Sequence, residues 1–193
     1  DQGRMNFTWP RVAAITNLTE EHLDYHGTME EYARTKAKLF GMVRTSEGCK
    51  VLNADDRTFP LYKGIPTAWT INYSIKRLFG PPPNNYECSL WATEIESSVS
   101  QTKAKILCNA KEGIPDLVLP MAGTFNMSNA LCAMCCVHMA GVSLDTAIEA
   151  LASFHGVPGR MERIDCGQSF SVFVDFTVTP ASYEATLKTA KGM

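Results

Sequence analysis

The spacing of apolar and polar positions predicts alternating strands and helices in the first part of the chain. Residues 11–18 contain an apolar run typical of a buried strand, and residues 28–43 repeat apolar side chains at the spacing of one helix face. Residues 49–53 predict the next strand, and residues 53–56 the turn after it. Strand, helix and strand in this order favour an α/β fold with a mostly parallel sheet and right-handed crossovers.

The rest of the chain predicts a change of architecture. Residues 80–85 are rich in proline and glycine and exclude a helix. Three short antiparallel strands follow, which we expect to form a small sheet appended to the main one: residues 87–96, 104–109 and 116–121. The last predicted elements are two helices, of which the second has Ser143 as its N-cap, a strand pair and a final helix: residues 126–140, 144–154, 161–166 with 169–176, and 180–191.

Composition excludes some classes of function but does not identify one. The 193 residues, 45% of them apolar, suffice for one core, or for one domain and part of another. A net charge of −2 gives no case for nucleic acid or an anionic membrane, and no apolar run is long enough for a transmembrane helix. The seven cysteines favour reduced thiols in a cytoplasmic protein. A zinc site at Cys132 and Cys135 is the alternative, although no second ligand pair is evident.

Lys36 stands out because of its position in the first predicted helix. At about 100° per residue it falls in the middle of the apolar stripe, close in phase to Tyr32, Ala33 and Phe40. One interpretation is a lysine whose stem packs on apolar surface while its amine reaches water. The other is a lysine that faces an active site or is chemically modified there.

The segment before this helix is rich in groups that bind metals or phosphate. Residues 16–27 hold two histidines and three acidic residues, and they follow the first predicted strand. Ligands of open α/β sheets bind at the carboxyl ends of strands, so this segment is a candidate metal or phosphate site. Thr28 and Glu31 fit a capping box that fixes the start of the helix. For His22, the alternative to a metal ligand is a histidine that caps the loop.

Four motifs in order carry a family resemblance that spans nearly the whole chain. They are TNLTEEHLDYHGTMEEYARTKAKLF at residues 16–40, GTFNMSNA at 123–130, VPGRME at 157–162, and VFVDF at 172–176 leading to Thr179-Pro180. Together they resemble the Mur ligases, most closely the MurE type.

The resemblance implies a domain organisation. Mur ligases have a central ATP-binding domain of the P-loop type and a Rossmann-like C-terminal domain. Residues 1–158 would be the latter part of the central domain, and residues 159–193 the start of the C-terminal one. The sequence contains no Gly-Lys-Thr/Ser phosphate loop, which the family places upstream. We therefore expect this chain alone to be inactive and to bind ATP weakly or not at all.

The resemblance also implies a reaction. MurE-type enzymes use ATP to add diaminopimelate or lysine to UDP-N-acetylmuramoyl-L-alanyl-D-glutamate through an acyl phosphate, in cytoplasmic peptidoglycan synthesis. Mg²⁺ ions offset the charge of the phosphates. His22 would be one Mg²⁺ ligand. Lys36 matches the family's carbamylated lysine, whose carbamate supplies the oxygen ligand that Mg²⁺ prefers, and partial burial would favour the neutral amine that carbamylation needs.

Five further residues take roles by the same resemblance. Asn126 and Asn129 lie three apart on one helix face and suit an adenine edge, although Asn126 also fits a simple helix cap. Arg160 would reach phosphate and Asp175 the ribose hydroxyls. Arg4 matches an arginine that contacts the muramoyl substrate. Pro158 and Gly159 make residues 157–160 a predicted hinge between the two domains.

One departure keeps other functions open. The last motif of the family has a histidine where this chain has Val178. A non-catalytic, Mur-ligase-like structural subunit of a larger assembly is therefore an alternative. A ligase acting on folate or poly-γ-glutamate substrates is a further one, which the His-Leu-Asp-Tyr-His stretch disfavours. The sequence sets neither the added amino acid nor the oligomeric state.

Overall fold

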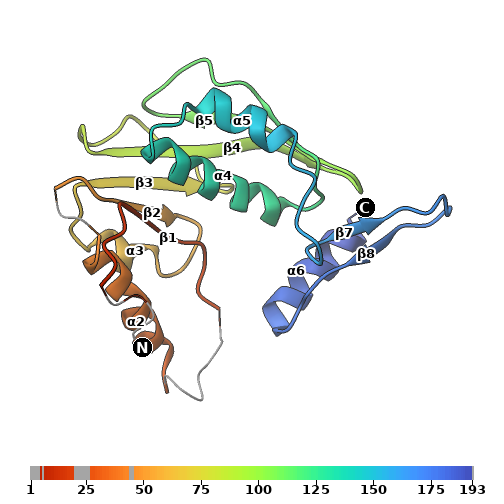
Figure 1. Ribbon diagram of the computed structural model, residues 1–193, viewed down its shortest axis with the longest axis horizontal. Helices are drawn as coiled ribbons and strands as arrows, with labels where there is room; N and C mark the ends of the chain where they lie inside the picture. The colour runs from red at the N-terminus through yellow and green to blue at the C-terminus, as the bar shows by residue number, and fades with distance from the viewer. Residues whose placement is uncertain (1–4, 6, 20–26, 44–45, 193) are drawn as a thin grey trace.

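The computed structural model describes residues 5, 7–19, 27–43 and 46–192 as an α/β fold (Figure 1). The strands are β1 (Val12–Ile15), β2 (Cys49–Asn53), β3 (Trp69–Ser74), β4 (Glu87–Ser97), β5 (Thr102–Cys108), β6 (Leu117–Leu119), β7 (Glu162–Ile164) and β8 (Val172–Val174). The helices are α2 (Met29–Gly41), α3 (Phe59–Lys63), α4 (Thr124–Met139), α5 (Leu144–Ala152) and α6 (Pro180–Lys191).

The main sheet changes strand direction at β4. Its six strands follow the order β1-β2-β3-β4-β5-β6. The pairs from β1 to β4 are parallel, and β4–β5 and β5–β6 are antiparallel. The antiparallel strands were predicted, but as an appended sheet of their own. They instead continue the main sheet, because β4 forms a parallel ladder with β3 from Thr70↔Glu87 to Ser74↔Trp91.

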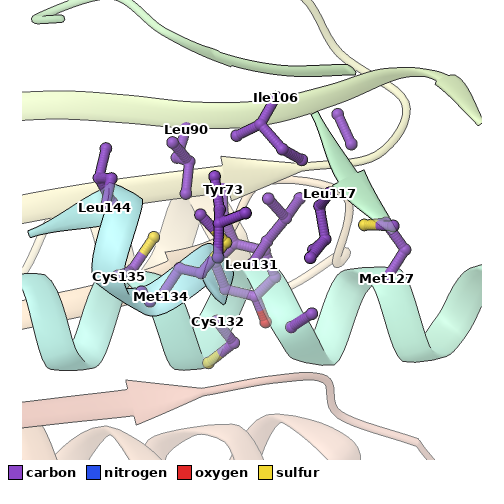
Figure 2. Close-up of a cluster of buried hydrophobic side chains, with 14 of the residues drawn as sticks. Tyr73, Leu90, Ile106, Leu117, Met127, Leu131, Cys132, Met134, Cys135 and Leu144 are labelled. Atoms are coloured by element: carbon purple, nitrogen blue, oxygen red, sulfur yellow. The ribbon is translucent and has the colours of Figure 1, made fainter. Parts of the chain in front are cut away.

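One face of this sheet packs on α4 and α5 and forms the main hydrophobic core (Figures 1 and 2). Every second residue of β2, β3, β4 and β5 points to this face, as the two-residue period of a strand requires. The fully buried members include Tyr73, Ile106, Leu131 and Met134. Ser143 caps α5 as predicted, because its Oγ accepts from the N–H of Thr146 at 3.0 Å.

The predicted reduced state of the cysteines agrees with the structure. All seven are free thiols, and Cys49, Cys132 and Cys135 are buried. Within the described part of the chain, no three histidine, cysteine or acidic side chains lie close enough to hold a metal, so the zinc alternative gains no support. In the same part, no helix combines the length and apolarity needed to cross a bilayer.

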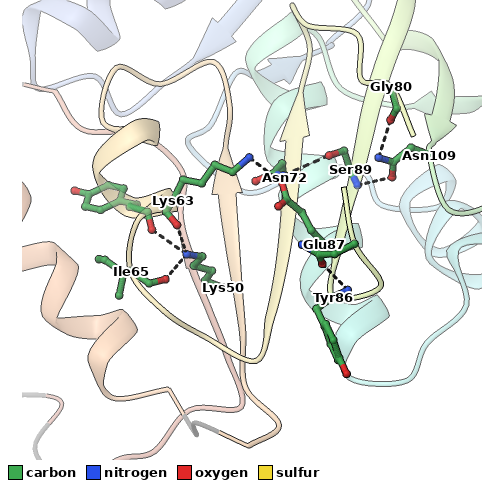
Figure 3. A network of polar contacts seen from close by, with 11 residues as sticks. Lys50, Lys63, Ile65, Asn72, Gly80, Tyr86, Glu87, Ser89 and Asn109 are labelled. Atoms are coloured by element: carbon green, nitrogen blue, oxygen red, sulfur yellow. Dashed lines mark hydrogen bonds and ion pairs between the residues drawn. The ribbon is translucent and has the colours of Figure 1, made fainter. Parts of the chain in front are cut away.

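The opposite face of the sheet is covered at the β1–β2 end by α2 and α3 (Figure 1). The Phe40 and Tyr62 rings meet edge to face at 5.5 Å beneath Leu52. Lys50 is 2% exposed on this face, and its Nζ donates to the carbonyls of Tyr62 at 3.1 Å, Lys63 at 2.7 Å, and Ile65 (Figure 3). These carbonyls lie at and just beyond the end of α3, so the amine caps a helix terminus, while burial lowers the Lys50 pKa.

Two elements were missed from sequence. The strand β3 carries the buried polar residues Asn72 and Ser74 on the face away from α4, which obscured its apolar pattern. Asn72 is accommodated because its Nδ2 donates to Glu87 Oε1 at 2.8 Å, and Glu87 also pairs with Lys63 at 2.9 Å (Figure 3). The helix α3 has five residues and includes Pro60.

The C-terminal segment, residues 159–192, projects from the sheet (Figure 1). Its strands β7 and β8 pair antiparallel, from Glu162↔Val174 to Ile164↔Val172, as the sequence predicted. The helix α6 begins at Pro180 and ends before Gly192, also as predicted, and Thr179 with Ser182 closes a capping box at its start. None of the residues of α6 is buried.

Candidate functional site

A pocket of about 710 Å³ lies where the end of β1, the first turns of α4 and the C-terminal segment meet. Its volume is in the range of sites that hold small molecules and cofactors. Four residues predicted from sequence line it: Asn126, Asn129, Arg160 and Asp175. The structure thus brings together side chains from α4, which covers the main sheet, and from the C-terminal segment.

The two asparagines of α4 differ in their surroundings. Asn126 is 5% exposed, and its Nδ2 donates to the carbonyl of Ala122 at 2.8 Å. This bond ties the first turn of the helix to the residue before its N-cap. The N-cap is Gly123, so Asn126 is not the helix cap that was the alternative, although its amide still has a structural partner. Asn129, one turn further along, lines the pocket from an exposed position. Asn129 is therefore the better placed of the two to contact a ligand.

Arg160 and Asp175 are both held by the backbone of the C-terminal segment. The Arg160 guanidinium donates from Nη1 to the Phe176 carbonyl at 2.9 Å and lies 5.5 Å from the centre of the Phe176 ring. Asp175 Oδ2 accepts from the Met161 N–H at 2.8 Å, and its Oδ1 accepts from the Thr186 hydroxyl at 3.4 Å. A carboxylate has about four acceptor positions, so Asp175 keeps capacity for a ligand hydroxyl.

Residues 157–160, which the sequence predicts as a hinge, are held by more contacts than a free hinge would have. Gly159 adopts φ +72°, and its N–H donates to Glu162 Oε2 at 2.8 Å. Its carbonyl accepts from the N–H of Phe176 at 2.7 Å, and Met161 follows at φ 46°. These contacts fix residues 159–162 to one another and to Phe176, just beyond β8. Movement about Val157 and Pro158 stays a prediction.

Several further pocket residues were given no individual role from sequence, although Thr16, Asn17 and Thr19 belong to the candidate metal or phosphate segment 16–27. Their shared property is a neutral polar side chain: Thr16, Asn17, Thr19, Ser128, Thr179, Ser182 and Thr186. Ser182 and Thr186 are spaced i, i+4 in the predicted final helix, and this spacing on one helix face was a usable signal. Apolar side chains complete the wall: Leu119, Met121, Phe125, Leu151, Phe154 and Val157.

Lys36 lies on the side of α2 that helix phase predicted, but its side chain is not buried. It shares a side of α2 with the buried residues Tyr32, Ala33 and Phe40, yet it is exposed. Its Nζ lies 5.3 Å from the centre of the Tyr32 ring. This exposure is compatible with the interpretation in which the amine reaches water, but it gives no support to the expected partial burial. The role of Lys36 in an active site stays a prediction.

Of the remaining predicted residues, the structure describes Thr28 and Val178 but not Arg4 and His22. Thr28 caps α2 as predicted, since its Oγ1 accepts from the N–H of Glu31 at 3.2 Å. Val178, the departure from the family motif, is 68% exposed and does not line the pocket.

The chemistry of the pocket suits an apolar ring attached to a hydroxyl-bearing group. Among the residues that the structure describes, its charged side chains are one arginine and one aspartate, so this part of the wall is close to neutral. Apolar and aromatic walls favour a flat base, while hydroxyl and carboxylate groups suit a sugar. Arg160 is the residue suited to an anionic oxygen.

The fold is that of the Mur ligases. MurF from Acinetobacter baumannii matches with a TM-score of 0.75 at 21% identity, over 95% of this chain and 38% of that one. MurF ligase from Thermotoga maritima, solved in complex with ADP, matches with a TM-score of 0.76 at 17% identity, over 96% of this chain and 40% of that one. Residues 1–137 match the Mur ligase middle domain. The chain belongs to the Mur ligase family.

Within the family, the similarity is strong to enzymes of one type. The UDP-N-acetylmuramoyl-L-alanyl-D-glutamate–2,6-diaminopimelate ligase of Geobacillus thermodenitrificans is 38% identical over 98% of this chain. The UDP-N-acetylmuramyl-tripeptide synthetase of Roseiflexus sp. is 33% identical over 90% of it. This chain spans 38% and 34% of the length of these two relatives.

Proposed function

We propose that this chain is part of a MurE-type ligase, which uses ATP to join diaminopimelate or lysine to UDP-N-acetylmuramoyl-L-alanyl-D-glutamate during cytoplasmic peptidoglycan synthesis. The γ-phosphoryl group of ATP passes to the substrate carboxylate, and the amine of the amino acid then displaces phosphate from the acyl phosphate. The names of the relatives, which span nearly the whole chain, support this reaction.

The observation that carries the proposal is the shared pocket. Motifs up to about 50 residues apart in sequence supply Asn129, Arg160 and Asp175 to one cavity. In the proposed complex the adenine lies against the apolar wall near Phe125, with the Asn129 amide at its polar edge. Asp175 accepts from the ribose hydroxyls. Arg160 turns from the Phe176 carbonyl to a phosphate oxygen, which exchanges a neutral acceptor for a charged one.

The proposal includes Mg²⁺, with His22 and a carbamylated Lys36 as ligands. Its support is the motif over residues 16–40, because the described residues bring no three ligand side chains together. The exposed Lys36 amine is open to CO₂. We expect a bound cation to stabilise the carbamate once it has formed.

The proposal leaves the added amino acid open. The relatives include an enzyme named for diaminopimelate and one named only for its tripeptide product. Retention of the pocket residues favours an enzyme over a structural subunit, and the exposed Val178 lies outside the pocket wall.

The direct test is a ligation assay with the full-length enzyme that carries this chain. The enzyme is incubated with ATP, Mg²⁺, UDP-N-acetylmuramoyl-L-alanyl-D-glutamate and either diaminopimelate or lysine, and the UDP-linked tripeptide and ADP are measured by mass spectrometry. We expect stoichiometric tripeptide and ADP with one of the two amino acids. A folded enzyme that forms no tripeptide with either would contradict the proposal.

Two matched pairs of variants assign the roles. Arg160→Ala should raise the KM for ATP, whereas Arg163→Ala, which removes an exposed arginine paired with Asp165 at 2.9 Å, should not. Lys36→Ala should abolish turnover with partial rescue by short-chain carboxylic acids, whereas Lys38→Ala on the same helix should stay active. Wild-type turnover in Lys36→Ala would rule out the carbamate.

A further inference from the structure

The turn after β2, residues 53–56, connects the carboxyl ends of three neighbouring strands. These are β1, β2 and β3, which run parallel and therefore end at one edge of the sheet. The pocket loop, residues 16–19, leaves this edge directly after β1 and contributes Thr16, Asn17 and Thr19 to the pocket. None of the turn residues 53–56 lines the pocket itself.

Asn53 uses both ends of its amide on this edge. Its Nδ2 donates to the carbonyl of Thr16 at 2.7 Å, and its Oδ1 accepts from the N–H of Asp55 at 2.9 Å. The amide therefore ties the first residue of the pocket loop to the turn. Only a side chain with both a donor and an acceptor makes these two bonds together.

Asp56 holds the same loop two residues further on. Its Oδ2 accepts from the N–H of Leu18 at 3.1 Å. Its Oδ1 accepts from the N–H of Thr58 at 2.8 Å and from the Thr58 hydroxyl, which fixes the carboxylate at the start of α3. Leu18 is itself buried, against Tyr32 and Ala33 of α2, so the backbone at this position is held from both sides.

Asp55, between these two residues, acts on a different strand. Its Oδ1 accepts from the Ser74 hydroxyl at 2.5 Å, and its Oδ2 accepts from the N–H of Ile75 at 2.8 Å. Asp55 thus ties the turn to the end of β3 rather than to the pocket loop. The turn thus contains two residues that hold the pocket loop, Asn53 and Asp56. It also contains a second aspartate, Asp55, that holds β3 instead.

We propose that Asn53 and Asp56 are positioning residues for nucleotide binding, because they hold the pocket loop so that Thr16, Asn17 and Thr19 face the bound nucleotide. This inference rests on the proposed function of the pocket. Without these bonds, the loop backbone between Thr16 and Leu18 must be ordered at the moment of binding, and the cost of ordering appears as lost affinity. The hydroxyl and amide side chains of the loop are neutral and donate hydrogen bonds, which suits the anionic oxygens of a nucleotide.

The test compares Asp56→Asn with Asp55→Asn in the full-length ligase. Each exchange conserves shape and replaces one carboxylate oxygen with an NH2 group. The exchange affects the contact with the pocket loop in Asp56→Asn and the contact with the end of β3 in Asp55→Asn. ADP affinity is measured by titration calorimetry. We expect the Kd for ADP to rise about tenfold in Asp56→Asn, about 1.4 kcal/mol, and to stay within about twofold of wild type in Asp55→Asn.

Two further measurements protect the test against a variant that folds poorly. Asn53→Asp removes the donor to Thr16 while keeping the acceptor for Asp55, and it should weaken ADP binding in the same way. Hydrogen exchange at the Leu18 amide should accelerate in Asp56→Asn but not in Asp55→Asn, while the amides of β5 exchange as in the wild type.

The outcomes separate the inference from the function on which it rests. If the wild-type enzyme does not bind ADP, the proposed function of the pocket fails. If the wild type binds and Asp56→Asn and Asn53→Asp bind equally well, or if Asp55→Asn loses as much affinity as Asp56→Asn, the positioning role is wrong and the turn serves stability alone.

Discussion

Two of the helices that line the pocket, α4 and α6, are held in different ways. The helix α4 buries seven residues against the sheet, whereas α6 buries none. Two contacts hold α6 to its surroundings. Thr186 donates to Asp175 at 3.4 Å, and the methyl group of Thr189 packs against Gly123, where an added Cβ would lie 3.1 Å from this methyl group. One wall of the pocket is thus part of a hydrophobic core, and the other is held by isolated contacts.

This difference separates stability from mobility within one site. Elements with few buried apolar contacts open at low cost, while elements of the core open only with global unfolding. The α4 wall should therefore stay in place in all folded states, and α6 should be the part that moves when a ligand enters or leaves.

The largest effect should come from a leucine pair, one on each helix. Leu131 of α4 is fully buried, so Leu131→Ala should lower the free energy of unfolding by about 2–5 kcal/mol through lost burial and the cavity left behind. Leu187 of α6 is 64% exposed, so Leu187→Ala should change it by less than about 0.5 kcal/mol. Urea denaturation of residues 1–193 measures both, and equal losses would refute the contrast between the two walls.

A glycine pair tests the anchoring of the C-terminal segment. Gly159 has φ +72°, and a side chain in this conformation costs about 1–2 kcal/mol. Gly159→Ala should therefore speed hydrogen exchange at the Phe176 amide, which bonds to the Gly159 carbonyl, by about tenfold or more. Gly41 ends α2 with open space around it, so Gly41→Ala should leave this exchange unchanged and slightly stabilise the helix. Unchanged exchange in Gly159→Ala would show that the segment is held without this turn.

Alkaline pH should lower the free energy of unfolding through Cys49, which lies in the core between the sheet and α4. Burial raises the pKa of Cys49 from 9.0 to about 12. The unfolded thiol loses its proton as the pH passes 9, while the folded thiol keeps it. The stabilisation is thus fully present below pH 9 and is lost at about 1.4 kcal/mol per pH unit as the pH rises toward 12. Denaturation at stepped pH should show a shallower slope in Cys49→Ala, and an identical slope would contradict this assignment.

The smallest effect distinguishes the two asparagines of α4. Asn126→Ala removes the bond to the Ala122 carbonyl and should cost about 1 kcal/mol of stability. Asn129→Ala removes an exposed amide, so stability should change little while the Kd for ADP rises. Thermal denaturation and ADP titration of both variants in the full-length enzyme would settle the roles, and a stability loss confined to Asn129→Ala would reverse them.

Much of the fold was predictable because local chemistry dictates it. The strand β2 has the predicted bounds, since its apolar run ends in a turn rich in asparagine and aspartate. The helix α6 begins at a proline behind a threonine cap and stops before a glycine, and both signals are local. The strand β3 was missed because Asn72 and Ser74 are buried through bonds to Glu87 and Asp55, which no local pattern reveals.

The sequence predicted which residues line the candidate site, but not which side chains are exposed or which contacts hold the site together. Motif order predicted Asn129, Arg160 and Asp175, and the structure places all three at one pocket. Helix phase gave the side of α2 on which Lys36 lies, but exposure depends on which elements cover that side. The contacts of Asn53 and Asp56 join residues 37 and 38 positions apart, and the sequence showed these two residues only as part of a turn.

The position of α4 in the chain has a consequence for synthesis on the ribosome. This helix follows all six strands of the sheet that it covers, and its last residue is Met139. The apolar face that carries Cys49, Val51 and Ile71 is therefore complete before its covering helix has been translated. Nascent chains that end before Thr124 should bind chaperones or aggregate, because their largest apolar surface has nothing to cover it.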